Sequence, residues 1–256
     1  MNLFIITLVV AFGLLLGLLA MLEAGRRLGN RRCAKEGKEA SEGLGALNGS
    51  IFGLMGLLVA FTFSGAASKF DARRGLIAQE ANDIGTAWLR LDLLPAATQP
   101  ALREKFRAYL DERLAAYRAI PDLSAAQAHA DRATALQGEI WTASVSASQA
   151  DQRASMLLLP ALNQMIDITT TRLMAMRTHP PAIIFILLVI VALASALLAG
   201  HGMSGRAGRS WLHMVAFAAI LAFSVYVIID IEFPRLGLIR VDSADQVLVE
   251  LRQSMH

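Results

Sequence analysis

Residues 3–22, LFIITLVVAFGLLLGLLAML, decide the fold of this chain. Fourteen of these residues are Leu, Ile, Val or Phe, and none is charged. A helix of this length spans about 30 Å, which is the thickness of the hydrocarbon core of a bilayer. Since each large apolar residue contributes about 0.3–0.6 kcal/mol, insertion into a membrane is favoured by several kcal/mol. The stretch therefore predicts a transmembrane helix.

Three further apolar stretches have the same character, at residues 44–66, 182–199 and 211–229. The chain is 55% hydrophobic and its mean hydropathy is +0.49, which exceeds the values typical of a soluble domain. We therefore predict an all-α polytopic membrane protein with four transmembrane helices. A helical extramembrane domain, called the stalk below, is expected between the second and third of them.

These spans predict four segments. They are a transmembrane hairpin at 1–66 with helices 3–22 and 44–66, a stalk at 67–181, a second hairpin at 182–231 with helices 182–199 and 211–229, and a tail at 232–256. Pro234 is expected to end the fourth helix. GLIRVD at 237–242 alternates apolar and polar residues, as a short strand or an extended hook would. A last amphipathic helix carrying Val247, Leu248 and Leu251 is expected to pack on the stalk or on a neighbouring subunit.

Prolines divide the stalk into helices at Pro95, Pro100, Pro121, Pro160 and the pair Pro180 and Pro181. Since 66–94 lacks proline, the second transmembrane helix is expected to continue into it. One apolar stripe at helical spacing consists of Leu102, Phe106, Tyr109, Leu110, Leu114 and Tyr117. Its expected partner is a helix at 148–176, with the stripe Leu159, Leu162, Met165, Ile166, Thr169, Leu173 and Met176.

Basic residues predict the orientation of the chain in the membrane. The loop after the first helix carries Arg26, Arg27, Arg31, Arg32, Lys35 and Lys38, and the loop after the third carries Arg206 and Arg209. Because basic loops remain in the cytoplasm, the N-terminus and the stalk are expected to be extracytoplasmic. Several basic residues flank the membrane on the stalk side and oppose this asymmetry. A cleaved signal peptide is the less favoured interpretation, since its basic residues would precede the apolar run.

The second transmembrane helix is the candidate for lining a pore. Four helices are too few to enclose a pore, so it would lie on a symmetry axis between subunits of a homo-oligomer. The candidate pore-lining or packing residues are Asn48, Gly49, Ser50, Gly53, Gly56, Ala60, Phe61 and Phe63. The small ones form a face that more commonly packs on another helix of the same subunit. The phenylalanines would gate a pore by dewetting or anchor the helix in lipid.

A second candidate is a polar cluster in the stalk. It comprises Asp71, Arg73, Arg74, Glu80, Asn82 and Arg90, with Arg172 on the return helix as a possible partner. Arg73 and Glu80 are two helical turns apart and therefore share a face. A ring of arginines would concentrate anions in a vestibule. The commoner role of such residues is a polar lock between helices.

Enzymatic and nucleic-acid-binding functions are not indicated. The five histidines contain no pair at metal-ligand spacing, and the chain lacks a phosphate-binding glycine loop and a serine elbow. We therefore expect no catalytic residues, no metal and no cofactor. The net charge of +3 is spread along the chain, which argues against a nucleic-acid partner. The expected partners are membrane lipid and further copies of the chain.

Two stretches resemble the bestrophin-like domain family of bacterial membrane proteins. They are LLVAFTFSGAASKFDARRGLIAQEANDIGTAWLRLDLLP at 57–95 and VIIDIEFPRLGLIRVD at 227–242. The matching residues are Phe70, Asp71, Arg73, Arg74, Glu80, Ala81 and Asn82, followed by Ile84, Gly85, Thr86, Leu89 and Arg90. The resemblance implies a multi-pass protein of the bacterial inner membrane, with oligomeric ion or anion conduction as its activity. Bestrophins themselves are pentamers with four transmembrane helices per subunit and a cytosolic helical region, which differs from the orientation expected here.

A second hypothesis comes from a different functional class. The chain would be a non-conducting scaffold, anchored in the membrane, whose stalk binds a protein partner. A pore predicts that bulky residues at Gly53 or Gly56 alter ion flux. A scaffold predicts that only changes in the stalk matter.

Overall fold

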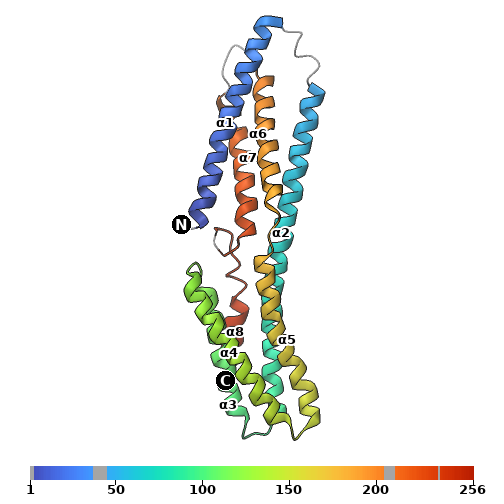
Figure 1. Cartoon of the computed structure of the whole chain (residues 1–256), viewed down its shortest axis with the longest axis vertical. Coiled ribbons are helices and arrows are strands. Elements are labelled where there is room, and N and C mark those ends of the chain that lie inside the picture. Colours follow the sequence, from blue (N-terminus) through green and yellow to red (C-terminus); the bar gives the residue numbers. More distant parts are fainter. Residues whose placement is uncertain (1–2, 37–44, 205–210, 236) are drawn as a thin grey trace. The chain divides into compact units, whose positions relative to one another are not determined.

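The computed structural model describes residues 3–36, 45–204, 211–235 and 237–256, and within these ranges it contains helices and no strand. The helices are α1 (Leu3–Glu36), α2 (Gly45–Arg90), α3 (Gln99–Arg118), α4 (Leu123–Ser148), α5 (Gln152–Arg177), α6 (Ala182–Gly202), α7 (Trp211–Glu232) and α8 (Gln246–Ser254), with the short 3-10 helix η2 (Leu91–Leu93) after α2 (Figure 1). Four apolar segments, in α1, α2, α6 and α7, are long and apolar enough to cross a membrane, in agreement with the four spans expected from the sequence.

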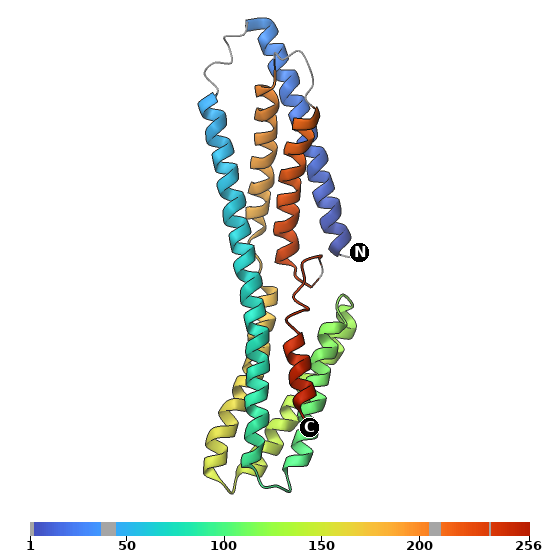
Figure 2. The ribbon, with the colours of Figure 1, turned by 180° about the vertical axis from the view of Figure 1, so that it is seen from behind.

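The chain divides into two compact units. The membrane unit comprises residues 1–68 and 179–233, and the stalk unit comprises residues 69–178 and 234–256. α2 is one uninterrupted helix that belongs to both (Figure 2). The predicted continuation of the second transmembrane helix is therefore confirmed.

In the membrane unit, α1 packs on α6 and α7. Glycines allow α1 and α6 to approach closely, because a β-carbon at Gly25 would collide with the carbonyl group of Leu197 and one at Gly200 with that of Leu22. Helices in lipid associate through such close packing, since apolar burial alone gives no advantage there. The glycines of α1 and α6 thus fix this helix pair.

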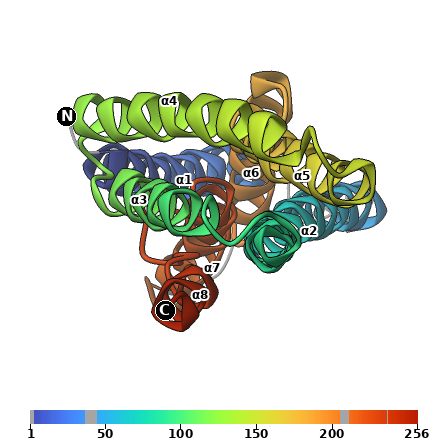
Figure 3. The same cartoon turned by 90° about the horizontal axis from the view of Figure 1, so that it is seen from below.

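In the stalk unit, α3 and α4 form a hairpin (Figure 3). The predicted stripe of α3 is buried from Leu102 to Tyr117. Its main partner is α4, however, and not the helix at 148–176, so that prediction was wrong. The sequence of α4 is rich in alanine and serine, and its short side chains mark no obvious face.

α5 also differs in detail from the prediction. Its buried face consists of Ala154, Leu158, Ala161, Leu162, Met165, Ile168 and Arg172. Leu173 and Met176 are exposed, because the packed face is rotated relative to the predicted stripe. Pro160 lies inside α5 and does not break it, so the packing of this helix outweighs the backbone hydrogen bond that proline cannot form.

The tail folds back within the stalk unit. Residues 237–242 form bends rather than a strand, and α8 packs on α3 through the fully buried Leu248. Of the two positions expected for the last helix, packing on the stalk is the one observed. Lys38, Arg206 and Arg209, which contributed to the predicted orientation, lie outside the described residues.

Candidate functional site

The membrane half of α2 presents its small residues away from the rest of the subunit. Gly49, Gly53, Gly56 and Ala60 are exposed, and apart from the adjoining backbone of α2 no described atom lies within 4 Å of the position that a β-carbon would occupy at any of the three glycines. Only 11% of the apolar window of α2 is buried, against 39% for that of α7. The small face of α2 is therefore open in the single subunit.

Part of the contact surface of α2 borders its small residues. Met55 and Ala66 are buried, and at 100° per residue both lie more than a quarter turn from Gly53 and Ala60. The rings of Phe52 and of Phe217 on α7 pack in a T-shaped arrangement with centroids 6.4 Å apart. Phe52 lies three residues after Gly49 and four before Gly56, on their side of the helix. The buried residues of α2 thus avoid the small face, whereas the contact of Phe52 lies at its edge.

The remaining predicted pore residues have varied surroundings. Asn48 is half-buried and Ser50 is exposed at the start of α2. Phe61 and Phe63 are 67% and 45% exposed, so neither ring is held by its own subunit. In this single chain the phenylalanines are placed for contact with lipid or with another copy.

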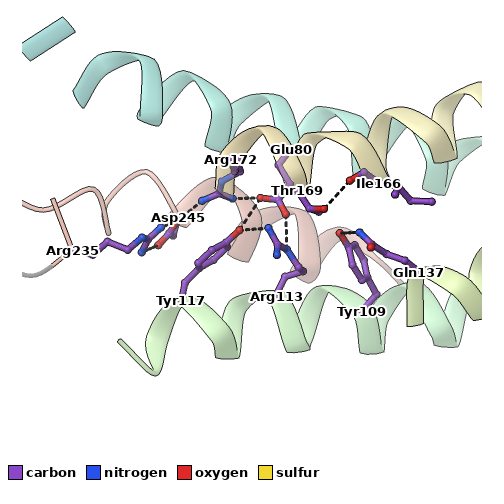
Figure 4. Close-up of polar contacts among 10 residues, drawn as sticks. All are labelled: Glu80, Tyr109, Arg113, Tyr117, Gln137, Ile166, Thr169, Arg172, Arg235 and Asp245. Carbon is purple, nitrogen blue, oxygen red and sulfur yellow. Dashed lines mark hydrogen bonds and ion pairs between the residues drawn. The ribbon is translucent and has the colours of Figure 1, made fainter. Parts of the chain in front are cut away.

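The buried charges of the stalk unit converge on Glu80 of α2 (Figure 4). Its carboxylate is completely buried and accepts hydrogen bonds from Arg113 Nε of α3 at 2.7 Å and from the Tyr117 hydroxyl at 3.1 Å. Arg172 of α5 forms an ion pair with the same carboxylate. Glu80 therefore joins α2, α3 and α5.

The tail adds a second pair to this cluster. Arg235 forms a bidentate ion pair with Asp245, with nitrogen–oxygen distances of 2.8 and 3.0 Å. Asp245 also lies 3.9 Å from Arg172, which connects the two pairs. Three buried or nearly buried arginines thus face two carboxylates, and Arg235 additionally meets the half-exposed Asp242 at 3.5 Å.

The ring of Tyr117 lies among these cations. The guanidinium carbons of Arg113, Arg172 and Arg235 are 5.0, 4.3 and 4.6 Å from its centroid. A cation within about 6 Å of an aromatic face is attracted by the ring quadrupole. Tyr117 therefore stabilises three like charges that would otherwise repel one another.

Burial changes the acid–base behaviour of the cluster. It raises the pKa of the Tyr117 hydroxyl far above its usual value, although the nearby Arg113 opposes the shift. Burial likewise raises the pKa of Tyr109, whose hydroxyl accepts a hydrogen bond from Gln137. Burial and then the neighbouring Arg235 lower the pKa of the Arg172 guanidinium, so this cation depends on the carboxylates that face it.

The other residues predicted for the stalk cluster do not join it. Arg73 is buried and donates to the carbonyls of Ala175 and Thr178, at 3.1 and 3.3 Å, near the end of α5. Arg90 donates to the carbonyl of Leu157. Asp71, Arg74 and Asn82 are exposed, and Asp71 and Arg74 form a loose pair at 3.7 Å.

Sequence reasoning missed Arg113, Arg235 and Asp245. Arg113 was the detectable one, because it follows Tyr109 by four residues and precedes Tyr117 by four, in the middle of the apolar stripe. A charge in that position indicates a buried counter-charge. Arg235 and Asp245 carry no such signal, since the tail has no periodic pattern before α8.

The second stretch that resembles the family carries two buried carboxylates in the membrane unit. Asp230 and Glu232 lie at the C-terminal end of α7. His179 Nδ1 is 3.0 Å from Glu232 Oε1, and its ring lies 4.6 Å from that of Phe233. These contacts tie the start of the 179–202 segment to the end of α7.

The Glu80 cluster has the geometry of a structural lock. Both carboxylate oxygens of Glu80 are engaged by side chains of the stalk unit. Among the described residues, no group of three His, Cys, Asp or Glu side chains is arranged to hold a metal ion. The chain thus has two distinct candidate features, an open face in the membrane and a closed polar cluster in the stalk.

Comparison with known proteins identifies the family. Residues 25–245 match the Bestrophin-like domain, a range that includes α2, the whole stalk from α3 to α5, and Asp245. No curated protein and no solved structure matches the chain. The resemblance seen in residues 57–95 and 227–242 is confirmed, and the chain belongs to the Bestrophin-like domain family.

Proposed function

We propose that this protein is a subunit of a homo-oligomeric ion channel in the bacterial inner membrane, with the membrane half of α2 lining the pore. The observation that carries the proposal is the open small-residue face formed by Gly49, Gly53, Gly56 and Ala60. A pore on a symmetry axis requires each subunit to present one helix face inward. The described chain has such a face available on α2.

The contrast between the glycines of α1 and α2 supports this proposal. Each glycine inside a helix costs about 0.5–1 kcal/mol relative to alanine. Gly25 and Gly200 compensate for that cost by allowing the close packing of α1 and α6. Gly49, Gly53 and Gly56 have no such contact within the described subunit, so a contact with another copy or a narrow water-filled path would account for them.

Family membership supports conduction of ions, and the resemblance to bestrophins supports anions in particular. α2 carries no ionisable side chain between Asn48 and Ser68. A pore lined by this segment would therefore present small residues, hydroxyl groups and phenyl rings. Phe63 is exposed and lies seven residues after Gly56, on the same side of α2, so its ring is the proposed hydrophobic constriction.

A scaffold remains the second candidate, and one feature of the stalk favours it. Leu89, Leu93, Met156 and Leu157 are exposed where the end of α2 and η2 meet the start of α5. Clustered apolar side chains on a soluble surface often mark a protein-binding site. In this alternative the membrane unit serves only as an anchor.

The mass of the purified oligomer is the first test. Light scattering of the detergent-purified protein, corrected for bound detergent, should give a closed assembly of about four or five subunits. A monomer would contradict the channel and leave the stalk as the functional region.

Ion flux is the second test. The protein in liposomes should release chloride, and Gly53→Leu should reduce the rate at least tenfold, because a side chain would enter the pore. Gly13→Leu is the matched control, since Gly13 also has open space around it but lies on α1. Equal flux in both variants would contradict a pore lined by α2.

The scaffold would be favoured by a different result. The unmodified protein would then show no ion flux, and Leu89→Asp would abolish the binding of a protein partner.

A further inference from the structure

The C-terminal turns of α1 carry a concentrated positive charge. Residues 23–36 contain five basic side chains, Arg26, Arg27, Arg31, Arg32 and Lys35, and two acidic ones, Glu23 and Glu36, a difference of +3. Glu23 pairs with Arg26 at 3.0 Å and with Arg27 at 2.8 Å. One carboxylate thus serves the first two arginines, and the positive charge is concentrated in the last two turns.

The basic turns lie directly beyond the apolar part of α1. The apolar residues end at Leu22, and Gly25 and Gly29 hold the following turns against Leu197, His201 and Ser204 of the segment that includes α6. Long helical side chains lean back toward the N-terminus of their helix. The side chains of the basic turns therefore lean back toward the headgroup layer of the membrane.

The exposed face of these turns carries an apolar side chain between basic ones, since the exposed Arg27 precedes Leu28 and lies one turn before Arg31. Leu28 is 53% exposed, and Arg31, Arg32 and Lys35 follow it by three, four and seven residues on the same side of the helix. Arg31, Arg32, Ala34 and Lys35 line an open hollow of about 460 Å³. The residues that line this hollow in the described part of the chain include three basic side chains and no carboxylate.

We propose that this hollow binds the phosphate of an anionic phospholipid, with Leu28 against the glycerol and the upper acyl chain. Arginine binds phosphate through paired N–H donors, and lysine adds a point charge. A free phosphate would use only the basic residues. Leu28 lies on the bilayer side of the basic residues that line the hollow, as the apolar part of a lipid lies on the bilayer side of its phosphate.

Lipid retention by the full-length protein tests the proposal. Native mass spectrometry after extraction into detergent should show phosphatidylglycerol retained in preference to phosphatidylcholine. The variant with Arg31→Gln, Arg32→Gln and Lys35→Gln should bind phosphatidylglycerol about a hundredfold more weakly, since each basic residue contributes roughly fivefold near an anionic surface. The matched control changes three exposed stalk arginines, Arg118→Gln, Arg132→Gln and Arg153→Gln, and should retain the lipid.

Two further measurements make the result decisive. Leu28→Asn should weaken phosphatidylglycerol binding without removing charge, and inorganic phosphate should not displace the lipid. If the triple variant fails to fold, Lys35→Gln alone should still show a fivefold loss. Equal retention in the triple variant and its control would overturn the proposal. The proposal would also be overturned if inorganic phosphate fully displaced phosphatidylglycerol, or if phosphatidylglycerol and phosphatidylcholine were retained equally.

Discussion

Glu80 is a fully buried charge at the centre of the stalk cluster. Its carboxylate is fully buried, and two arginines and a tyrosine hydroxyl engage it. Removing one member of a buried ion pair costs about 3–5 kcal/mol, because the remaining charge keeps its desolvation penalty. An exposed pair contributes about 0–1 kcal/mol. Glu80 should therefore outweigh any exposed charge of the stalk.

The first prediction concerns this carboxylate. Glu80→Gln keeps the shape of the side chain but leaves Arg113 and Arg172 with one carboxylate fewer, so the free energy of unfolding of the stalk should fall by about 3 kcal/mol or more. Asp71→Asn, at the exposed pair with Arg74, should change it by less than about 1 kcal/mol. The free energies of unfolding of both variants can be measured by denaturing the detergent-solubilised protein and monitoring hydrogen exchange in α3. Similar values for the two variants would show that the cluster contributes little.

The buried tyrosines predict a loss of stability at alkaline pH. Because burial raises the pKa of Tyr109 and Tyr117 above the unfolded value of about 10, the folded stalk binds more protons than the unfolded chain above that pH. The stabilisation is complete below pH 10 and is lost as the pH rises, at up to about 1.4 kcal/mol per pH unit for each tyrosine. Tyr117→Phe should reduce the slope by up to about 1.4 kcal/mol per pH unit. Phenolate absorbance appearing at pH 10 before unfolding would contradict the prediction.

At this scale the sequence located some of the buried charges but not all of their partners. Arg73 and Glu80 were expected on one face because they are two helical turns apart, and both are buried. Arg172, expected as a possible partner, forms an ion pair with Glu80, 92 residues away. Local periodicity gave no signal for Arg252 and Asp111, 141 residues apart, because such pairs depend on how the helices pack.

Among the elements, α1 and α6 approach each other closely at their glycines. Gly25→Leu would place a side chain where the backbone of Leu197 lies, so the helices must separate and lose their contact. We expect a large drop in melting temperature in detergent, since overpacking typically costs about 1–3 kcal/mol even where atoms can shift. Gly13→Leu on the same helix meets no atom within 4 Å and should melt normally. A normal melting temperature for Gly25→Leu would refute this packing.

α8 is held on the stalk by an apolar contact and an ion pair, and their contributions to stability can be measured separately. Leu248 is fully buried, whereas Arg252 pairs with the exposed Asp111 at 2.8 and 3.0 Å. Leu248→Ala should cost about 2–5 kcal/mol, and Arg252→Gln at most about 1 kcal/mol. Hydrogen exchange in residues 246–254 should therefore rise strongly in the first variant only. A greater effect of Arg252→Gln would mean that the ion pair holds the tail.

The elements differ in how well the sequence predicted them. α1, α6 and α7 follow from composition alone, because the membrane requires about twenty apolar residues in a row. The stripe of α3 follows from large side chains at helical spacing. The partner of α3 did not follow, since α4 buries Ala133, Gln137 and Ser144 as well as Ile140. A packed helix face made of small and polar residues has the same sequence pattern as a helix face exposed to solvent.

At the scale of the whole molecule, the charge distribution and the resemblance to bestrophins lead to opposite expected orientations. Among the described residues, the C-terminal turns of α1 are strongly basic, which favours the cytoplasm for that end and the opposite side for the stalk. The likeness to bestrophins favours a cytosolic stalk instead. The stalk also carries many charges. Those of the cluster around Glu80 pair with one another, so they add little to the difference in charge between the two sides of the membrane.

The last prediction therefore concerns the side of the membrane that holds the stalk. In a Cys33→Ser background the chain has no other cysteine, so Arg153→Cys on the exposed start of α5 gives a single reporter. Since the basic turns of α1 should remain in the cytoplasm, a membrane-impermeant maleimide should label this cysteine in intact spheroplasts. Arg31→Cys, in the same background, should be labelled only after lysis. The reverse pattern would place the stalk in the cytosol and align the orientation with that of bestrophins.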